Sequence, residues 1–435
     1  MNSSIENNFF ATEDELNRLV VFIGGFDPRG ARYYHQLMRS ESDKQSGFLE
    51  KIFYKVGKRN KIAKTEGMGG GHSQWIIESS SSLKKSSSDF IFFDWHDEVQ
   101  KNWTEKRWSV FFQAIYTYAA IFKLKEWLAP IRLQARYTLW ALMYPLAYVL
   151  LVILLGLGLG LLFSTNTESA SGAVAVALCF LGLALWGGLA LDRYIHVSWL
   201  LRILNFAHSS SLKKSPVLDE RIDAMAQELA QGMQQARWRE VVIVGFSVGS
   251  VQAVKLTAAL RGKLAEVQSS PHSSGLGSQG EVNLLTLGNC IPLFALFPGA
   301  GDFRRSLRDV AQDRQVYWAD ISSPSDSVCF GMCDVVGLSL REDGVKLASE
   351  PSGPESAASG VGKKVGQWGL NPQVMCSPRF HKLFLPETYR WLRRNKMRMH
   401  FQYLMAGEVA GAYDYFELLT CPGSLRDYIE KKLVR

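Results

Sequence analysis

Two long uncharged runs lie close together in the first half of the chain. The first, Tyr137–Phe163, reads YTLWALMYPLAYVLLVILLGLGLGLLF, and the second, Gly172–Leu191, reads GAVAVALCFLGLALWGGLAL. About 20 apolar residues suffice for a helix to cross a bilayer, and neither run shows the polar stripe of a soluble core helix. The short polar stretch Ser164–Ser171 between them suits a turn. The sequence therefore predicts a transmembrane hairpin, with a hairpin buried in a soluble core as the alternative.

Basic residues flank this hairpin on both outer sides, whereas the turn inside it has none. They are Lys123, Lys125, Arg132 and Arg136 before it and Arg193, Arg202, Lys213 and Lys214 after it. Segments rich in Lys and Arg stay on the cytoplasmic side of a membrane. We therefore expect an integral membrane protein with two passes, whose soluble domain and both termini are cytoplasmic.

The hairpin contains several glycines, and aromatic segments flank it on both sides. Small residues let membrane helices approach closely, and we expect this of Gly156, Gly158, Gly160, Gly187 and Gly188. The flanking segments Trp108–Trp127 and Ile195–Phe206 mix aromatic and aliphatic residues with Lys and Arg. That mixture is typical of segments in the membrane interface, although plain core helices are an alternative.

Composition narrows the classes of partner. The 435 residues hold 49 Lys and Arg against 41 Asp and Glu, a net charge of +8, without an arginine-rich stripe interleaved with aromatics. Nucleic-acid binding is therefore excluded, and the basic excess suits an anionic membrane surface. The six cysteines show no paired metal-ligand spacing, so neither a metal site nor a cofactor is expected. No pattern indicates a protein partner.

Outside the hairpin, apolar runs and helical patterns alternate. Buried strands are expected in LVVFIGG, DFIFFDW (89–95), VVIVG, VNLLTLGN and QVYWADI, weaker ones in Lys51–Val56 and Gln74–Glu78, and a surface loop in Ser79–Ser88. Repeated strand–helix units predict an α/β fold with a doubly wound, mostly parallel sheet. Residues 1–100 and 216–435 would form its two halves, and residues 101–215 would be a membrane insertion.

A catalytic motif follows one of these strands. Gly245-Phe246-Ser247-Val248-Gly249 matches G-x-S-x-G, after an apolar strand and at the start of a helix. That context favours a strained turn that exposes a serine hydroxyl, whereas a glycine turn used only for packing is the alternative. Here the chain resembles the α/β-hydrolase superfamily, specifically its lipase and esterase-like members. The resemblance covers about residues 1–100 and 216–420 and implies Ser247 as nucleophile.

A serine nucleophile needs a base and an acid that orients it. The resemblance implies that the acid follows a later strand, which favours Asp326 in SSPSDSV over Asp320 and Asp334. Two histidines come after it. His400 is preferred because HFQYL is similar to the His-x-x-Tyr arrangement at the catalytic histidine of several esterase-like families, and His381 is the alternative.

Acyl transfer also needs donors for the oxyanion that develops. Val248 supplies one backbone N–H by position, after the nucleophile. The resemblance places a second donor in the turn after an early strand, at Gly25 or Phe26 in IGGFDPRG. An ordinary glycine turn is the alternative there.

Together these features predict a membrane-anchored serine hydrolase that cleaves carboxylic esters through an acyl-enzyme. A serine held close to the bilayer favours a lipid or another amphipathic acyl substrate. An acyltransferase with the same residues, and a non-catalytic scaffold or lipid-binding protein on a hydrolase fold, are the alternatives. No residue pattern identifies the acyl chain or the head group.

Overall fold

The structure is a computed structural model that describes residues 17–49, 52–62, 72–81, 84–104, 106–212, 215–268, 280–340 and 374–434. Its centre is a mixed sheet of nine strands in the order β2-β4-β5-β1-β6-β7-β8-β9, with β3 also paired to β4. The parallel strands are β1 (Arg18–Ile23), β5 (Lys85–Phe92), β6 (Glu240–Phe246), β7 (Glu281–Leu287), β8 (Val316–Ile321) and β9 (Val374–Cys376). The antiparallel ones are β2 (Ile52–Val56), β3 (Asn60–Ile62) and β4 (His72–Ser81).

The prediction of a mostly parallel sheet is therefore wrong at one side of the sheet. The expected loop Ser79–Ser88 is instead the end of β4 and the start of β5, which a short connection makes antiparallel. Its serines find partners in the fold: Ser79 Oγ and Ser86 Oγ lie 2.8 Å apart, and Ser88 Oγ donates to the Leu419 carbonyl at 2.8 Å. These side-chain bonds stabilise strands whose sequence is typical of a loop.

Helices cover both faces of the sheet because its central strands alternate their apolar side chains between two cores. Leu19, Val21 and Ile23 of β1 face one core, whereas Val20 and Phe22 face the other. The first core is covered by α7 (Val197–Leu212), α8 (Pro216–Gln234), α9 (Gly249–Gln268), α10 (Ile291–Ala295), α11 (Gly301–Gln312) and α12 (Val335–Ser339). The second is covered by α1 (Gly30–Leu49), α14 (Lys396–Phe401), α15 (Tyr415–Thr420) and α16 (Leu425–Lys432).

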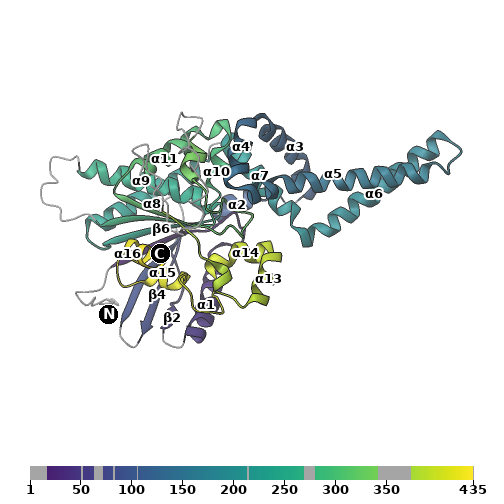
Figure 1. The fold of residues 1–435 in the computed structure, drawn as a ribbon. Helices are drawn as coiled ribbons and strands as arrows, with labels where there is room; N and C mark the ends of the chain where they lie inside the picture. The colour runs from purple at the N-terminus through teal and green to yellow at the C-terminus, as the bar shows by residue number, and fades with distance from the viewer. Residues whose placement is uncertain are drawn as a thin grey trace, which may run out of the picture.

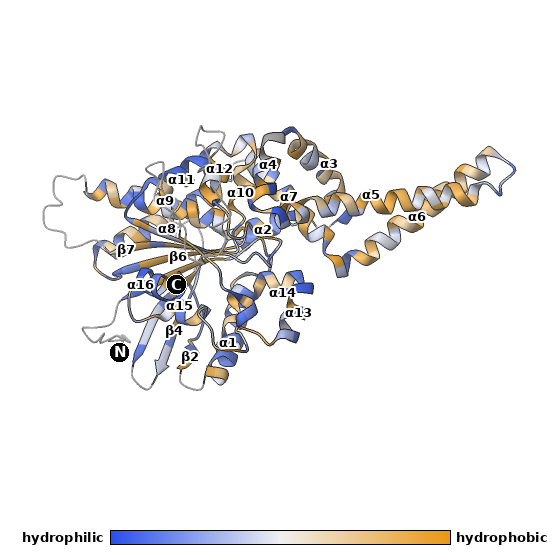
Figure 2. Cartoon of the chain, in the orientation of Figure 1, coloured by the Kyte–Doolittle hydropathy of each residue, from blue (hydrophilic) through white to orange (hydrophobic). Residues whose placement is uncertain are grey.

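A helical hairpin projects far from this body (Figure 1). It consists of α5 (Arg136–Ser164) and α6 (Ala170–Ile195), both long and apolar enough to cross a membrane. Figure 2 shows that the pair is largely hydrophobic along its length and hydrophilic at its tip. The two helices contain the predicted spans 137–163 and 172–191, and most of their side chains face outward rather than into a protein core. A hairpin buried in a soluble core is therefore excluded.

Three of the five predicted glycines lie where α5 and α6 meet. A Cβ on Gly160 would come within 2.7 Å of the Ala177 Cα, and a Cβ on Gly156 within 2.9 Å of the Leu181 Cα. Gly188 packs against Val152 and Tyr148 in the same way. The other two, Gly158 and Gly187, have no neighbour within 4 Å of the Cβ position. Only part of the predicted set therefore acts at the helix interface.

The segments before and after the hairpin differ in how deeply their side chains are buried. The first contains α2 (His96–Asn102), α3 (Arg107–Lys123) and α4 (Lys125–Gln134). In α3, large apolar side chains such as Phe112 and Tyr116 are 64% and 74% exposed. The second flank, α7, is a core helix: Val197 and Leu204 are fully buried, so the alternative holds there. Of the flanking basic residues, Lys213 and Lys214 lie outside the described part of the chain.

Candidate active site

Ser247 stands on a sharp turn between β6 and α9. Its φ of 56° lies in the left-handed region, which is unfavourable for a residue with a side chain. The Ser247 N–H donates to the Leu287 carbonyl at 2.9 Å, and its carbonyl accepts from Ser250 Oγ at 2.6 Å. The turn is thus fixed on both sides of its strained residue.

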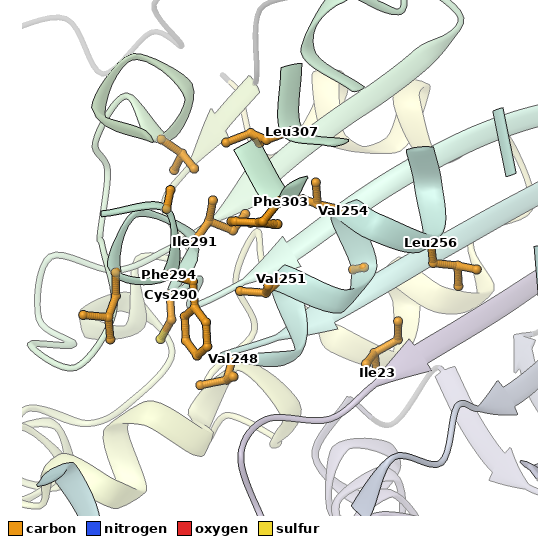
Figure 3. Packing of buried hydrophobic residues seen from close by; sticks show 14 of the residues in the cluster. Ile23, Val248, Val251, Val254, Leu256, Cys290, Ile291, Phe294, Phe303 and Leu307 are labelled. Atoms are coloured by element: carbon orange, nitrogen blue, oxygen red, sulfur yellow. The ribbon is translucent and has the colours of Figure 1, made fainter. Parts of the chain in front are cut away.

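The glycines around Ser247 are required by close backbone contacts. A Cβ on Gly249 would lie 2.2 Å from the Ile23 carbonyl oxygen, and one on Gly245 would lie 2.5 Å from the Ser250 Cα. Neither space admits a methyl group without backbone movement. Figure 3 shows Val248 and Val251 packed in the buried cluster beside Phe294, which anchors the start of α9.

A histidine and an aspartate complete a hydrogen-bonded chain that begins at Ser247. His400 Nε2 lies 2.8 Å from Ser247 Oγ, and His400 Nδ1 lies 2.7 Å from Asp326 Oδ2. All three side chains are buried, with Ser247 only 4% exposed. The structure therefore brings together the three residues that were preferred from the sequence, from the turn after β6, from the loop after β8 and from α14.

Neighbouring groups hold the aspartate and the histidine in position. The Val328 N–H donates to Asp326 Oδ1 at 3.1 Å, which leaves Oδ2 for His400. The His400 ring packs against Phe246, with centroids 5.1 Å apart. The Tyr403 hydroxyl accepts from the Ser323 N–H at 2.8 Å and thereby ties the His-x-x-Tyr segment to the aspartate loop.

The rival acids and the rival histidine have other surroundings. Asp320 is fully buried and accepts from Thr286 Oγ1 at 2.6 Å, and burial raises its pKa to about 6. Asp334 caps α12 by accepting from the Gly337 N–H at 2.8 Å, and burial raises its pKa as well. His381 is exposed on a 3₁₀ turn, Phe380–Lys382, beside Tyr389.

The candidate oxyanion donors also lie beside Ser247. A Cβ on Gly25 would be 3.0 Å from the Ser247 Cβ, so the turn after β1 runs directly past the serine. The backbone N–H groups of Val248, Gly25 and Phe26 donate to no acceptor among the described residues. Phe26 is fixed by stacking on Phe206 of α7 at a centroid distance of 4.4 Å. Buried N–H groups without a protein acceptor beside a serine suit an oxyanion.

Cys290 is a close neighbour of the serine that the sequence analysis did not place in the site. Its Sγ lies 3.8 Å from Ser247 Oγ, and burial raises the pKa of the thiol to about 12. The thiol therefore stays protonated at neutral pH, and it contributes an apolar surface to the site rather than a nucleophile.

A cavity of about 680 Å³ lies beside the cluster formed by Ser247, His400 and Asp326, where the hairpin joins the body. Two of its wall residues contact the cluster: Val328, which bonds Asp326, and Trp199, whose ring meets His400 edge to face at 6.4 Å. The other walls come from the start of α5, the end of α6, α13 (Pro386–Arg394) and α14. Trp199 was not predicted as a site residue, because its segment was compared with membrane-interface segments. The cavity residues of α13 were not predicted because no sequence motif marks them.

Comparisons of the chain with models of known families, with curated proteins and with solved structures find no match. No group of three or more potential metal ligands occurs within the described residues. The side chains of the site are therefore the basis for its proposed chemistry.

Proposed function

We propose that this chain is a membrane-anchored serine hydrolase of α/β-hydrolase type that cleaves carboxylic esters. The observation that carries the proposal is the hydrogen-bonded chain from Ser247 through His400 to Asp326. A hydroxyl, an imidazole and a carboxylate in that order are what nucleophilic acyl transfer requires. The strained turn under Ser247 and the unpaired N–H groups beside it support the same reaction.

The first half of the reaction acylates the serine. His400 Nε2 accepts the Ser247 proton while Oγ attacks the ester carbonyl carbon, and Asp326 stabilises the imidazolium through Nδ1–H. The N–H of Val248 and that of Gly25 or Phe26 hold the oxyanion. As the tetrahedral intermediate collapses, His400 gives the proton to the departing alcohol oxygen, and an acyl-enzyme remains.

The second half releases the acid. Water attacks the acyl-enzyme carbonyl, His400 accepts the proton of that water, and the proton returns to Ser247 Oγ when the intermediate collapses. An alcohol in place of water would make the protein an acyltransferase through the same residues. A non-catalytic scaffold would leave the alignment of these three side chains without a role.

Membrane anchoring rests on α5 and α6, whose length and composition suit a transmembrane hairpin. The first and last turns of the hairpin carry Arg136 and Arg193, whereas the connection between the helices has no basic residue. We infer that the body lies on the cytoplasmic side and that α3, with its exposed aromatic side chains, touches the membrane surface.

Ester hydrolysis by site variants tests the proposal. For the full chain in detergent micelles, Ser247→Ala and His400→Ala should each lower kcat for 4-nitrophenyl acyl esters by at least about a thousandfold, because each removes a member of the proton-transfer chain. His381→Ala is the matched control and should retain wild-type kcat. A folded Ser247→Ala protein with near wild-type kcat would exclude the proposed nucleophile.

A further inference from the structure

The cavity beside the proposed active site is lined by cations and by no carboxylate among the described residues. Its two charged wall residues are Arg394, at the end of α13, and Lys396, at the start of α14; both are exposed. Neither forms an ion pair within the described part of the chain, whereas Arg390 on the same helix pairs with Glu387 at 3.8 Å. The rim of the cavity therefore carries two cations that pair with no carboxylate among the described residues.

Several aromatic side chains of the wall are exposed. Trp140 of α5, Tyr194 of α6 and Trp391 of α13 are 75%, 67% and 54% exposed and line the same cavity. Trp and Tyr concentrate where a transmembrane helix enters the headgroup region. Because Trp140 and Tyr194 lie at the base of the hairpin, the cavity opens at the depth of the lipid headgroups.

The walls of the cavity supply the groups that an amphipathic ester would contact. The cations lie on α13 and α14, aromatic and aliphatic side chains come from the roots of α5 and α6, and Trp199 and Val328 contact the proposed triad. A lipid ester joins a polar headgroup to an acyl chain through its ester bond, so it needs all three kinds of contact. Ser247 is only 4% exposed, so side chains around it have to move to admit the ester carbonyl.

We propose that the substrate of this site is an acyl ester with a net negative headgroup, taken from the membrane through this cavity. This inference rests on the proposed hydrolase function and names its substrate class. Arg394 and Lys396 attract the anionic headgroup, and the aromatic wall receives the acyl chain. Both cations are specificity residues that touch the headgroup and take no part in the proton transfers.

Two lysophospholipids with the same acyl chain test the proposal. Lysophosphatidylglycerol carries a net negative headgroup, whereas lysophosphatidylcholine adds a positive charge that the two cations repel. In identical mixed micelles, we expect the full-length wild type to hydrolyse the former with a kcat/KM about tenfold higher, the range of two exposed ion pairs. Arg394→Gln/Lys396→Gln should abolish that preference, mainly by raising KM for the anionic substrate.

The control is Arg393→Gln, which removes an exposed cation of the same helix that does not line the cavity, and it should keep the wild-type preference. Equal turnover of the two lysophospholipids by the wild type, or a preference that the double variant keeps, would overturn the substrate class. If wild type cleaves no ester at all, the hydrolase proposal itself fails, and the two failures are thereby distinguished.

Discussion

At the scale of single residues, the site depends on contacts that leave no room for other side chains. Ser247 keeps an unfavourable backbone conformation, which costs about 1 to 3 kcal/mol, because Gly249 packs against the carbonyls of Ile23 and Gly24. The same contact brings the turn at Gly25 against the serine. The positions of Ser247 and of the backbone N–H groups proposed as oxyanion donors are therefore set by one close approach of two turns.

The neighbouring thiol gives a prediction at this scale. With the pKa of Cys290 raised to about 12 by burial, on the order of one thiol in ten thousand is a thiolate at pH 8. Iodoacetamide at pH 8 should therefore leave ester hydrolysis intact, although Sγ lies 3.8 Å from Ser247 Oγ. Mass spectrometry of the treated protein checks that Cys290 is unmodified. Loss of activity in the wild type but not in Cys290→Ala would show that the thiol is reactive.

At the scale of elements, the clearest local signals were predicted well from the sequence. The turn at Ser247 was predicted from the G-x-S-x-G motif after an apolar strand, and the two helices were predicted from their long uncharged runs. The serine-rich ends of β4 and β5 were expected to be a loop, because Ser79, Ser86 and Ser88 have a loop-like composition and depend on partners such as the Leu419 carbonyl, far along the chain. For α7 the sequence left an interfacial segment and a core helix both open for a similar reason, since the burial of this helix depends on what packs against it. The contribution of α13 to the cavity could not be predicted either, because it depends on which helices the fold brings next to α13.

The packing of α5 against α6 gives a prediction for those helices. Gly160→Leu should force the helices apart, because even its Cβ would lie 2.7 Å from the Ala177 Cα, and overpacking of this kind costs about 1 to 3 kcal/mol. Unfolding by SDS in mixed micelles measures the loss of free energy. Gly158→Leu, two residues away with no neighbour within 4 Å, is the control and should not lower it. Equal effects of the two substitutions would place the helix interface elsewhere.

At the scale of the whole molecule, the hairpin and the sheet are joined beside Ser247, His400 and Asp326. α7 continues from the end of α6, places Trp199 against His400 and stacks Phe206 on Phe26. The hairpin extends from one side of the body (Figure 1), and residues at the roots of α5 and α6 line the cavity beside Trp199. The chain between the two halves of the sheet, from the end of β5 to the start of β6, thus forms the hairpin and also contributes α7 to the surroundings of His400.

The most direct test of the account is covalent capture of the nucleophile in a bilayer. The full chain reconstituted in lipid nanodiscs would be treated with a fluorophosphonate, digested and examined by mass spectrometry. The account predicts an adduct on Ser247 in the wild type, and almost none in His400→Ala, whose serine lacks its base. Folded wild-type protein without an adduct, or with the adduct on another serine, would contradict it.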